Sequence, residues 1–522
     1  MSSVITRRHL LLAFVLLVPA AAFLLEGAAE LTPEELRGRQ IYQEGTSPSG
    51  GEIVAVLGED QIEIPASSVP CSSCHGRDGR GRPEGGVSPS DLRWESLTRP
   101  YGVTHPSGRT HPAYDERLLK RAVSLGLDPA GQPLHVAMPR FRMSLGDMAD
   151  LVAYVKRLGG DPAPGVSETS VRIGVVLPPP GALSPLGEAV RAALAAQLAR
   201  WNAEGGLYGR TLELRSVEPP APPAERRAAV AAFLDRENVL AVAAPFLPGA
   251  EAELTTLFTE REVPVIGPFT LHPRSEAGRS IFYLLPGLEA QGRALARFAG
   301  SLPAGAEGAR PAIAAAAGDD LAATIAGIRD AAPAPPALVR WPAGAFEPAE
   351  AARSLAAVGA DPVFFLGSGA EAVSLLQAAA AIGWHPRLLL TAAAADAPLF
   401  FAPPAFDGRL FVALPALTGN EPPEAWRTLA AQGGLSLKHL SAQLTALAAA
   451  EVLAEGLRRT GRDLSRDRLV EQLEGLRKLP LVYGPPVTYS PVRRLGANGA
   501  YIVRMDREHR VFVPVGGWIE AD

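Results

Sequence analysis

The sequence predicts a multidomain protein in which an all-α domain precedes a larger, two-lobed α/β domain. Its 522 residues exceed the length at which a single hydrophobic core keeps growing. Residues 31–158 contain helical apolar stripes separated by turn-rich chain, whereas residues 171–522 alternate short apolar runs with loops and helical patterns. Between them, residues 159–170 are rich in glycine, proline and serine, which is typical of a linker.

The composition is that of an ordinary folded protein, with 47% hydrophobic and 20% charged residues. The formal net charge is -5, so the chain lacks the strongly basic character that proteins use to bind phosphate backbones. We therefore expect no nucleic-acid partner.

The N-terminus has the pattern of a secretory signal. Arg7 and Arg8 precede an uncharged apolar run at 10–25, which small residues at 27–29 follow. We expect residues 1–30 to act as a signal peptide or N-terminal anchor and the protein to be exported to the periplasm. An uncleaved segment would anchor it to the inner membrane. The arginine pair also fits the twin-arginine route.

Two helices are predicted in the first domain. At the first, Thr32 is a capping residue, Pro33 suits the first helical position and Glu35 completes a capping box. At the second, Ser144 is the capping residue. One face of the second helix is an apolar stripe of Met148, Leu151, Val152, Val155 and Leu158. The intervening chain at 45–112 is expected to be irregular.

The only two cysteines of the chain lie between these helices, in the stretch "PCSSCHG". Cys71, Cys74 and His75 form C-x-x-C-H, the pattern of a c-type haem attachment site. Two thiols three residues apart on a turn reach the two vinyl groups at one edge of the porphyrin, and the adjacent histidine serves as the proximal iron ligand. We predict one covalent haem c.

Three other interpretations each fit part of this pattern. A zinc half-site needs further cysteine or clustered histidine ligands, and the chain has no second cysteine pair. A thioredoxin-like redox pair would begin a helix in a βαβ unit rather than lie in turn-rich chain. A structural disulfide is compatible with export but does not require His75.

A sixth ligand to the iron is expected from the chain before the second helix. Met138, in "AMPRFRMS", is the favoured residue, because Pro139 restricts its backbone and the helix begins soon afterwards. Met143 is the nearest competitor, whereas Met148 belongs to the apolar stripe and is expected in the core. The alternative nitrogen ligands are His105, His111 and His135.

Taken together, these segments resemble a class I cytochrome c domain over residues 31–158. The matching pieces are "GRQIY", "CSSCHGRDGRG", "MPRF" and "DMADLVAYVKRL", in that order. The resemblance implies a covalent haem, His75 and Met138 as its axial ligands, and one-electron transfer. The chain departs from a minimal member by an insertion at 43–70, which would cover the haem edge, dock onto the neighbouring domain or form a surface loop.

The second domain begins with the apolar strand "VRIGVVL" at 171–177. The helix that follows places Val190, Leu194 and Leu198 on one face and is expected to end at Gly205. The segments "VLAVAAPF", "VPVIGPF", "PAIAAAAG" and "VFFLGSG" repeat this order of strand, loop and helix. The alternation predicts parallel sheets covered by helices. Roughly 350 residues are too many for one such sheet, so two lobes are expected.

This part resembles the type I periplasmic binding proteins of the branched-chain amino-acid-binding kind, over residues 171 to about 518. The agreement lies in "VRIGVVLPPPGALSPLGEAVRAALAAQLARWNAEGGLYGRTLEL", "VPVIGPFTLHP" and "GPPVTYSPVRRLGANGAYIVRM", among other segments. The resemblance implies two lobes, three segments crossing between them and a small-molecule ligand in the cleft.

The departures from that family concern the ligand's carboxylate, which its members hold with hydroxyls and backbone amides on two loops. Here residues 245–249 offer no hydroxyl, and Leu271 stands where the second loop usually has threonine. The ordinary amino-acid pocket is therefore in doubt. The candidate ligand contacts are Phe246, Thr270, Asp319 and Ser368.

These observations predict an exported monohaem c-type cytochrome with a fused small-molecule-binding module, which transfers electrons to or from a periplasmic dehydrogenase or oxidase. No catalytic constellation is recognised, so we expect no enzyme. One alternative is a solute-binding protein of an ABC uptake transporter with an accessory haem domain. Another is a ligand-responsive redox sensor.

Overall fold

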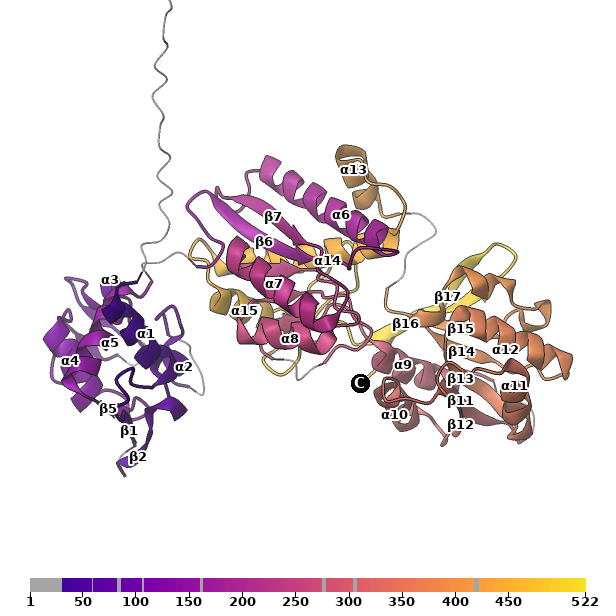
Figure 1. The fold of residues 1–522 in the computed structure, drawn as a ribbon, viewed down its shortest axis with the longest axis horizontal. Helices are drawn as coiled ribbons and strands as arrows, with labels where there is room; N and C mark the ends of the chain where they lie inside the picture. The colour runs from indigo at the N-terminus through magenta and orange to yellow at the C-terminus, as the bar shows by residue number, and fades with distance from the viewer. Residues whose placement is uncertain are drawn as a thin grey trace, which may run out of the picture. The chain divides into compact units, whose positions relative to one another are not determined.

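A computed structural model gives the fold of the chain (Figure 1). It divides into two compact units, Met1–Asp161 and Pro162–Asp522, which are described separately below. The predicted signal peptide or anchor at 1–30 lies outside the described residues. The structure describes residues 31–58, 60–81, 86–105, 108–159, 163–274, 278–303, 308–416 and 422–522.

The first unit is built mainly of helices. Both predicted helix starts are confirmed: Thr32 and Glu35 form the reciprocal capping box, and the Ser144 hydroxyl accepts a hydrogen bond from the Asp147 backbone N–H. The helices are α1 (Pro33–Glu44), α2 (Cys71–His75), α3 (Trp94–Leu97), α4 (Glu116–Leu125) and α5 (Leu145–Arg157).

Helices α1 and α5 cross in close contact at Gly38. A side-chain carbon at this position would lie 1.9 Å from the carbonyl oxygen of Asp150, so only glycine permits the approach. The same crossing carries a bidentate ion pair, in which Arg37 Nε donates to Asp150 Oδ2 at 2.7 Å. The rings of Tyr42 and Tyr154 meet beside it, with centroids 5.5 Å apart. The first and last helices of the unit are thus packed together.

The insertion at 43–70 forms a β-hairpin, which corrects the expectation that this chain is irregular. Strand β1 (Val54–Leu57) pairs antiparallel with β2 (Ile62–Pro65) on one side. On its other side β1 pairs antiparallel with β5 (Arg140–Arg142), giving a sheet of order β2-β1-β5. A turn of 3-10 helix, η1 (Ala66–Ser68), leads from β2 toward α2.

A second small hairpin lies between α3 and α4. Its strands are β3 (Val103–Thr104) and β4 (Thr110–His111). Beyond it, Asp115 caps α4 through its side chain, and Gly126, with φ of 68°, ends that helix in the left-handed conformation. The otherwise helical unit therefore carries two small antiparallel sheets that the sequence patterns did not predict.

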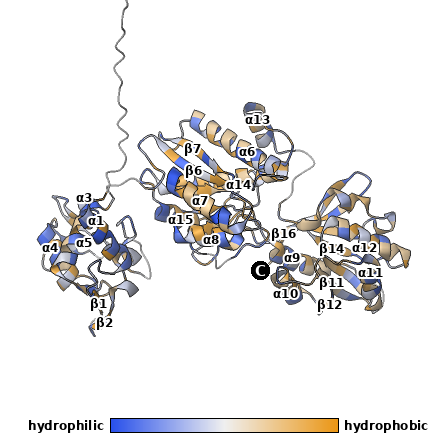
Figure 2. Ribbon diagram, in the orientation of Figure 1, coloured by the Kyte–Doolittle hydropathy of each residue, from blue (hydrophilic) through white to orange (hydrophobic). Residues whose placement is uncertain are grey.

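The first lobe of the second unit contains a parallel sheet of order β10-β9-β8-β6-β7. Helices on both faces bury its apolar side chains, as the alternation of strand and helix predicts. Figure 2 shows the hydropathy of these strands and helices along the ribbon. The strands are β6 (Ser170–Val176), β7 (Thr211–Val217), β8 (Ala241–Ala243), β9 (Val265–Ile266) and β10 (Ile281–Phe282). The helices are α6 (Ser184–Ala203), α7 (Pro223–Glu237), α8 (Glu251–Glu260), α13 (Glu424–Gly433), α14 (Leu440–Thr460) and α15 (Arg466–Glu474).

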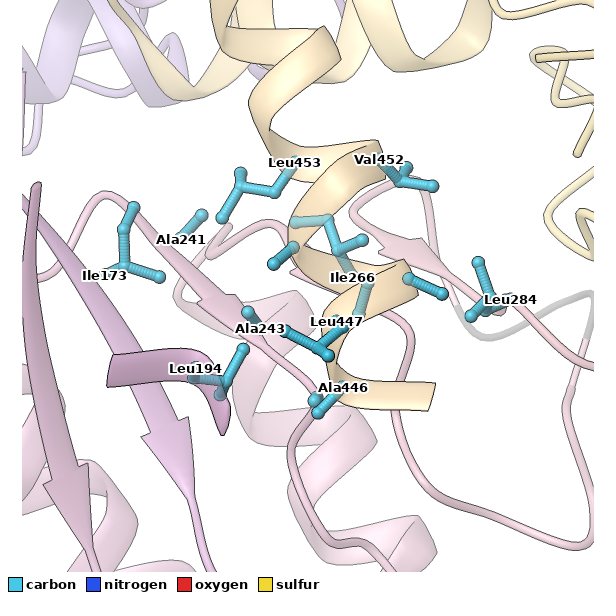
Figure 3. Packing of buried hydrophobic residues seen from close by; sticks show 14 of the residues in the cluster. Ile173, Leu194, Ala241, Ala243, Ile266, Leu284, Ala446, Leu447, Val452 and Leu453 are labelled. Atoms are coloured by element: carbon cyan, nitrogen blue, oxygen red, sulfur yellow. The ribbon is translucent and has the colours of Figure 1, made fainter. Parts of the chain in front are cut away.

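Helix α14 is the central core helix of this lobe. Leu447 and Leu453 are almost fully buried in the same cluster as Ile173, Ala243 and Ile266 of the sheet (Figure 3). By length and hydropathy α14 could cross a membrane, but 67% of its most apolar window is buried inside the protein. Packing against the sheet is therefore sufficient to explain its apolar composition.

The second lobe contains a mixed sheet of order β12-β11-β13-β14-β15-β16-β17, in which the last two strands run antiparallel to their neighbours. Its strands are β11 (Arg310–Ala316), β12 (Ala337–Trp341), β13 (Ala360–Leu366), β14 (Leu388–Thr391), β15 (Leu410–Leu414), β16 (Gly499–Asp506) and β17 (Val511–Glu520). The helices α9 (Leu288–Ser301), α10 (Ala322–Ala331), α11 (Pro348–Ala357) and α12 (Gly369–Ala381) cover its two faces, with the short turns η2 (Ala392–Ala394), η3 (Ala397–Phe401) and η4 (Pro404–Phe406).

Three segments connect the two lobes, after β10, after β15 and between α15 and β16. The first and third pair with each other: the Tyr283 N–H donates to the Arg494 carbonyl at 2.9 Å, and the Gly496 N–H donates to the Tyr283 carbonyl at 2.8 Å. Arg494 is 4% exposed and donates to Glu474 of α15 at 2.6 Å. The predicted two-lobed α/β fold is confirmed.

Candidate haem-attachment site and ligand-binding loops

The two thiols lie on the single helical turn α2. Cys71 and Cys74 are three residues apart, so their side chains are neighbours on the same side of the turn. Cys71 is half-buried against the core of the unit, Cys74 is exposed, and both are free thiols rather than a disulfide. Burial raises the pKa of the Cys71 thiol to about 12.

The imidazole of His75 is buried, with an exposed fraction of 5%. Its Nδ1 lies 2.8 Å from the carbonyl oxygen of Ser90, and because a carbonyl only accepts, Nδ1 carries the proton. This bond leaves the lone pair on Nε2. Burial lowers the pKa of His75 below its usual value, which favours the neutral ring. A neutral imidazole whose other nitrogen is fixed by a second partner is the form that ligates metals.

The chain at His75 is held by two hydrogen bonds, one from a distant helix and one from the loop that follows. The Tyr42 hydroxyl of α1 donates to the Gly76 carbonyl at 2.7 Å, and the Gly81 N–H donates to the His75 carbonyl at 2.8 Å. Gly76 adopts a φ of 74°, which a residue with a side chain rarely adopts. The turn is therefore anchored at the histidine and directly after it.

These residues fit a covalently attached haem c. Two free thiols on one turn would form the thioether bonds, and the Nε2 lone pair of the adjacent, buried His75 would ligate the iron. When bound, the haem supplies one-electron redox chemistry. Among the residues that the structure describes, no group of three or more His, Cys, Asp or Glu is placed to hold a metal ion, which leaves the zinc interpretation without support.

Met138 lies two residues before β5 and is half-buried against the core of the unit. Its N–H donates to the His135 carbonyl at 2.9 Å, and the guanidinium of Arg140 donates to its carbonyl oxygen. Met143 is also half-buried against this core, whereas Met148 is 8% exposed on α5, as its place in the apolar stripe predicts. The assignment of Met138 as the axial ligand remains a prediction.

The alternative histidines each have a partner within the unit. His105 and His111 face each other with 2.9 Å between their Nε2 atoms, and His111 Nδ1 donates to the Pro112 carbonyl at 2.8 Å. His135 is exposed, and its Nδ1 accepts the Ala137 N–H at 3.2 Å. Each of the three imidazole rings therefore has a hydrogen-bond partner within the protein.

A buried carboxylate that the sequence analysis did not single out organises the chain before Met138. Asp128 is fully buried, and its carboxylate accepts hydrogen bonds from Arg109 Nη1 at 2.6 Å and from the Gln132 N–H at 2.9 Å. The guanidinium of Arg121 donates to the Asp128 carbonyl oxygen. Burial raises the pKa of the neighbouring Tyr114 to about 12. The turn sequence "LDPAGQPL" was the available signal.

In the second unit, the loop after β8 uses its backbone donors internally. The Phe246 N–H donates to the Val176 carbonyl at 2.8 Å, and the Leu247 N–H donates to the Phe269 carbonyl at 3.2 Å. The Gly249 N–H donates to a carboxylate oxygen of Glu251 at 2.9 Å. The prolines at 245 and 248 have no N–H to offer. Because these N–H groups already donate to partners within the protein, they are not available to bind the carboxylate of a ligand.

The other predicted ligand contacts lie on loops that also follow strands. The Thr270 hydroxyl, after β9, accepts the His272 N–H at 3.1 Å. Asp319, after β11, is exposed. Ser368, after β13, is the capping residue of α12, where its hydroxyl and N–H both bond to Glu371. The ligand roles of Phe246 and these three residues remain predictions.

A cavity of about 140 Å³ lies elsewhere in the first lobe, between α6, the sheet and α14. It contains none of the four predicted contacts, and its lining from the end of α6 to the start of β7 places it away from the loops that follow the strands. It is lined by Ile173, Leu198, Trp201, Glu204, Gly206, Leu207, Leu212, Leu453, Ala454, Leu457 and Arg458.

The fold and the site define a cytochrome-like unit followed by a two-lobed binding unit. A family model described as periplasmic binding protein matches residues 170–510, and one described as cytochrome c matches residues 68–159. The chain belongs to the periplasmic binding protein family and carries a cytochrome c domain in front of it. The cytochrome c match implies covalently bound haem c.

Solved structures resemble the binding unit in fold. A fatty acid ABC transporter substrate-binding protein from Thermomonospora curvata is 16% identical, with 69% of this chain and 95% of that chain covered and a TM-score of 0.54. A branched chain amino acid ABC transporter protein from Thermus thermophilus with bound valine is also 16% identical, with 68% and 97% covered and a TM-score of 0.54. An ABC transporter substrate-binding protein from Aeropyrum pernix is 18% identical, with 68% and 97% covered and a TM-score of 0.55. A comparison with curated protein sequences gives no significant match.

Proposed function

We propose that the protein is an exported monohaem c-type cytochrome that transfers single electrons and carries a fused module for binding a small molecule. The observation that supports this most directly is the buried His75, whose Nδ1 is bonded to the Ser90 carbonyl beside two free thiols. One haem is proposed because the sequence contains a single C-x-x-C-H motif. Neither half is proposed to catalyse a reaction on a substrate.

The redox partner is proposed to be a periplasmic dehydrogenase or oxidase, because both matched families are typically periplasmic. The segment at 1–30 would direct export and, if it is retained, hold the protein at the inner membrane. Electron transfer needs no chemical change at a bound substrate, so the partner has only to approach the haem edge.

The first experiment is an absorption spectrum of the full chain, made in a host that attaches haem c and recorded in the oxidised and reduced states. Wild-type protein should show a Soret band and, when oxidised, the weak far-red band of sulfur bound to ferric haem. Met138→Ala should abolish the far-red band, whereas the matched control Met143→Ala should keep it. The reverse pattern would make Met143 the ligand, and colourless protein would remove the cytochrome function.

The ligand of the binding module is proposed to be amino-acid-like, in line with the valine-bound structure of similar fold. The engaged amides of the loop after β8 count against a carboxylate held there. Thr270, with its hydroxyl on the neighbouring loop, is the contact that would replace them. Isothermal titration of the full chain with amino acids and short-chain acids tests this, and a Thr270→Val variant should weaken any binding seen.

A second candidate function is solute capture for an ABC uptake transporter, which the similarity to such substrate-binding proteins favours. Uptake and the redox-sensor alternative differ in whether the oxidation state of the haem affects ligand binding. Uptake predicts that ligand affinity is unaffected by haem oxidation state. A midpoint potential that shifts on adding ligand would instead favour the redox-sensor alternative, by thermodynamic linkage.

A further inference from the structure

The hairpin formed by the insertion is joined to the segment that carries Met138. Strand β5 begins at Arg140, two residues after Met138, and its antiparallel partner is the hairpin strand β1. In the register of that pair, Ala55 lies opposite Phe141. The insertion therefore contacts the predicted ligand segment through backbone pairing, which a surface loop would not require.

This pairing is part of the hydrophobic core of the unit. Ala55 is fully buried, and its partner Phe141 is 4% exposed. Ile53 and Ala66, at the two ends of the hairpin, are 5% and 1% exposed. The base of the hairpin and strand β1 are therefore part of the core in which β5 packs. The outer strand β2 instead carries exposed side chains such as Ile62.

Arg140 holds the same segment from its other end. Its guanidinium donates to the carbonyl oxygen of Met138 and, at 3.2 Å, to that of Leu134. The side chain lies directly against Gly126, where an added side-chain carbon would be 1.6 Å from Arg140 Nε. The chain on both sides of Met138 is therefore fixed, by the guanidinium before it and by β1 after it.

We propose that the hairpin at 54–65 is a positioning element that holds the Met138 segment against the core and so limits the release of the methionine from the iron. The proposal rests on the proposed ligation by Met138. A strand without its partner loses hydrogen bonds that must then be made with water, so local opening of the segment becomes more frequent. We expect such opening to release the methionine from the iron, because the side chain moves with its backbone.

The structure offers a deletion that removes the hairpin without stretching the flanking chain. The Ala66 N–H donates to the Ile53 carbonyl at 3.0 Å, so the chain ends on either side of the hairpin already meet. Replacing residues 54–65 by Gly-Gly should close the gap. The matched control is Ile62→Ala, which changes a 58% exposed side chain on the same hairpin and leaves β1 intact.

The full chain with haem attached is titrated with alkali while the far-red band is recorded, and amide hydrogen exchange is measured across residues 138–142. We expect the deletion to lower the midpoint for loss of the band by at least one pH unit and to speed exchange at least tenfold. Ile62→Ala should leave both unchanged. A deletion variant with a Soret band but with wild-type midpoint and exchange would overturn the proposal.

A charge exchange decides the question if the deletion variant does not fold. Arg142 of β5 forms an ion pair with Glu63 of β2, across β1, and both side chains are exposed. Glu63→Arg should lower the pH midpoint for loss of the far-red band, and it should speed amide exchange by about twofold to threefold. Adding Arg142→Glu should restore the wild-type midpoint and exchange rate. No change in Glu63→Arg would overturn the proposal. Absence of the far-red band in wild-type protein would instead contradict Met138 ligation, while exchange still reports on the hairpin.

Discussion

Replacing Gly38 by alanine is expected to destabilise the cytochrome unit although alanine is the better helix former. An added side-chain carbon would lie 1.9 Å from the Asp150 carbonyl oxygen, and such contacts essentially never fall below 3.0 Å. The obstacle is backbone rather than a flexible side chain. Helices α1 and α5 would therefore have to move apart by about 1 Å.

The magnitude follows from three opposing contributions. Alanine gains about 1 kcal/mol over glycine in helix propensity. Overpacking of this kind costs about 3 kcal/mol, because a gap of this size along the interface forfeits a quarter to a half of the dispersion energy of its contacts. The Arg37–Asp150 pair is accessible to solvent, so its separation adds only a small further loss. We expect a net loss of about 2 to 3 kcal/mol.

The assay is guanidinium unfolding of the full chain, followed by the Soret band and by hydrogen exchange in α1 and α5. A loss of about 2 kcal/mol lowers the unfolding midpoint by roughly 0.5 M for a slope of about 4 kcal/mol/M. The matched control is Gly146→Ala in α5, where the nearest atom would be 3.7 Å away, and it should be neutral or stabilising. Wild-type stability in Gly38→Ala would refute the close crossing of the two helices.

The remaining predictions concern charged groups in the binding unit. Burial raises the pKa of Glu451 from 4.5 to about 7, so the folded unit holds this proton more tightly than the unfolded chain, and stability falls as pH rises through about 7. One group contributes at most about 1.4 kcal/mol per pH unit, and partial exposure reduces this, so urea unfolding should show a loss of about 1 to 2 kcal/mol between pH 5 and 8 that Glu451→Gln lacks. If the stability of wild-type protein and of Glu451→Gln depended on pH in the same way, the raised pKa of Glu451 would be contradicted. Glu474→Ala should cost about 3 kcal/mol, because it leaves the buried Arg494 without its carboxylate, and the double variant with Arg494→Met should recover part of that loss. A double variant less stable than Glu474→Ala would show that the ion pair is not the cause.

Helix starts were predictable because their signals are local. The capping box of Thr32 and Glu35 and the cap at Ser144 each join groups three residues apart, and both form as expected. The C-x-x-C-H pattern is equally local, since one helical turn places Cys71 and Cys74 together. The parallel sheets followed from the order of strands and helices rather than from any single residue.

Contacts between distant residues could not be predicted in this way. The two strands of the hairpin at 54–65 have four residues each, too short for their pattern to be distinctive, and β5, the other partner of β1, lies more than 80 residues after β1. The Asp128 cluster depends on Arg109, which was not distinguishable from a solvated arginine before the chain folded around it. The partners of the loop amides at 246–250 are likewise set by neighbouring strands.

The sequence alone predicted the order of the domains, the thiols and histidine proposed for haem attachment, and the capped helices and parallel strands, because each depends on groups within about four residues or on a repeated pattern. Only the tertiary structure decided which nitrogen of His75 carries the proton, what the insertion pairs with and whether the loop amides are available. Those outcomes depend on which backbone groups meet after folding, and a chain that buries its polar groups must pair them with partners that sequence distance does not reveal.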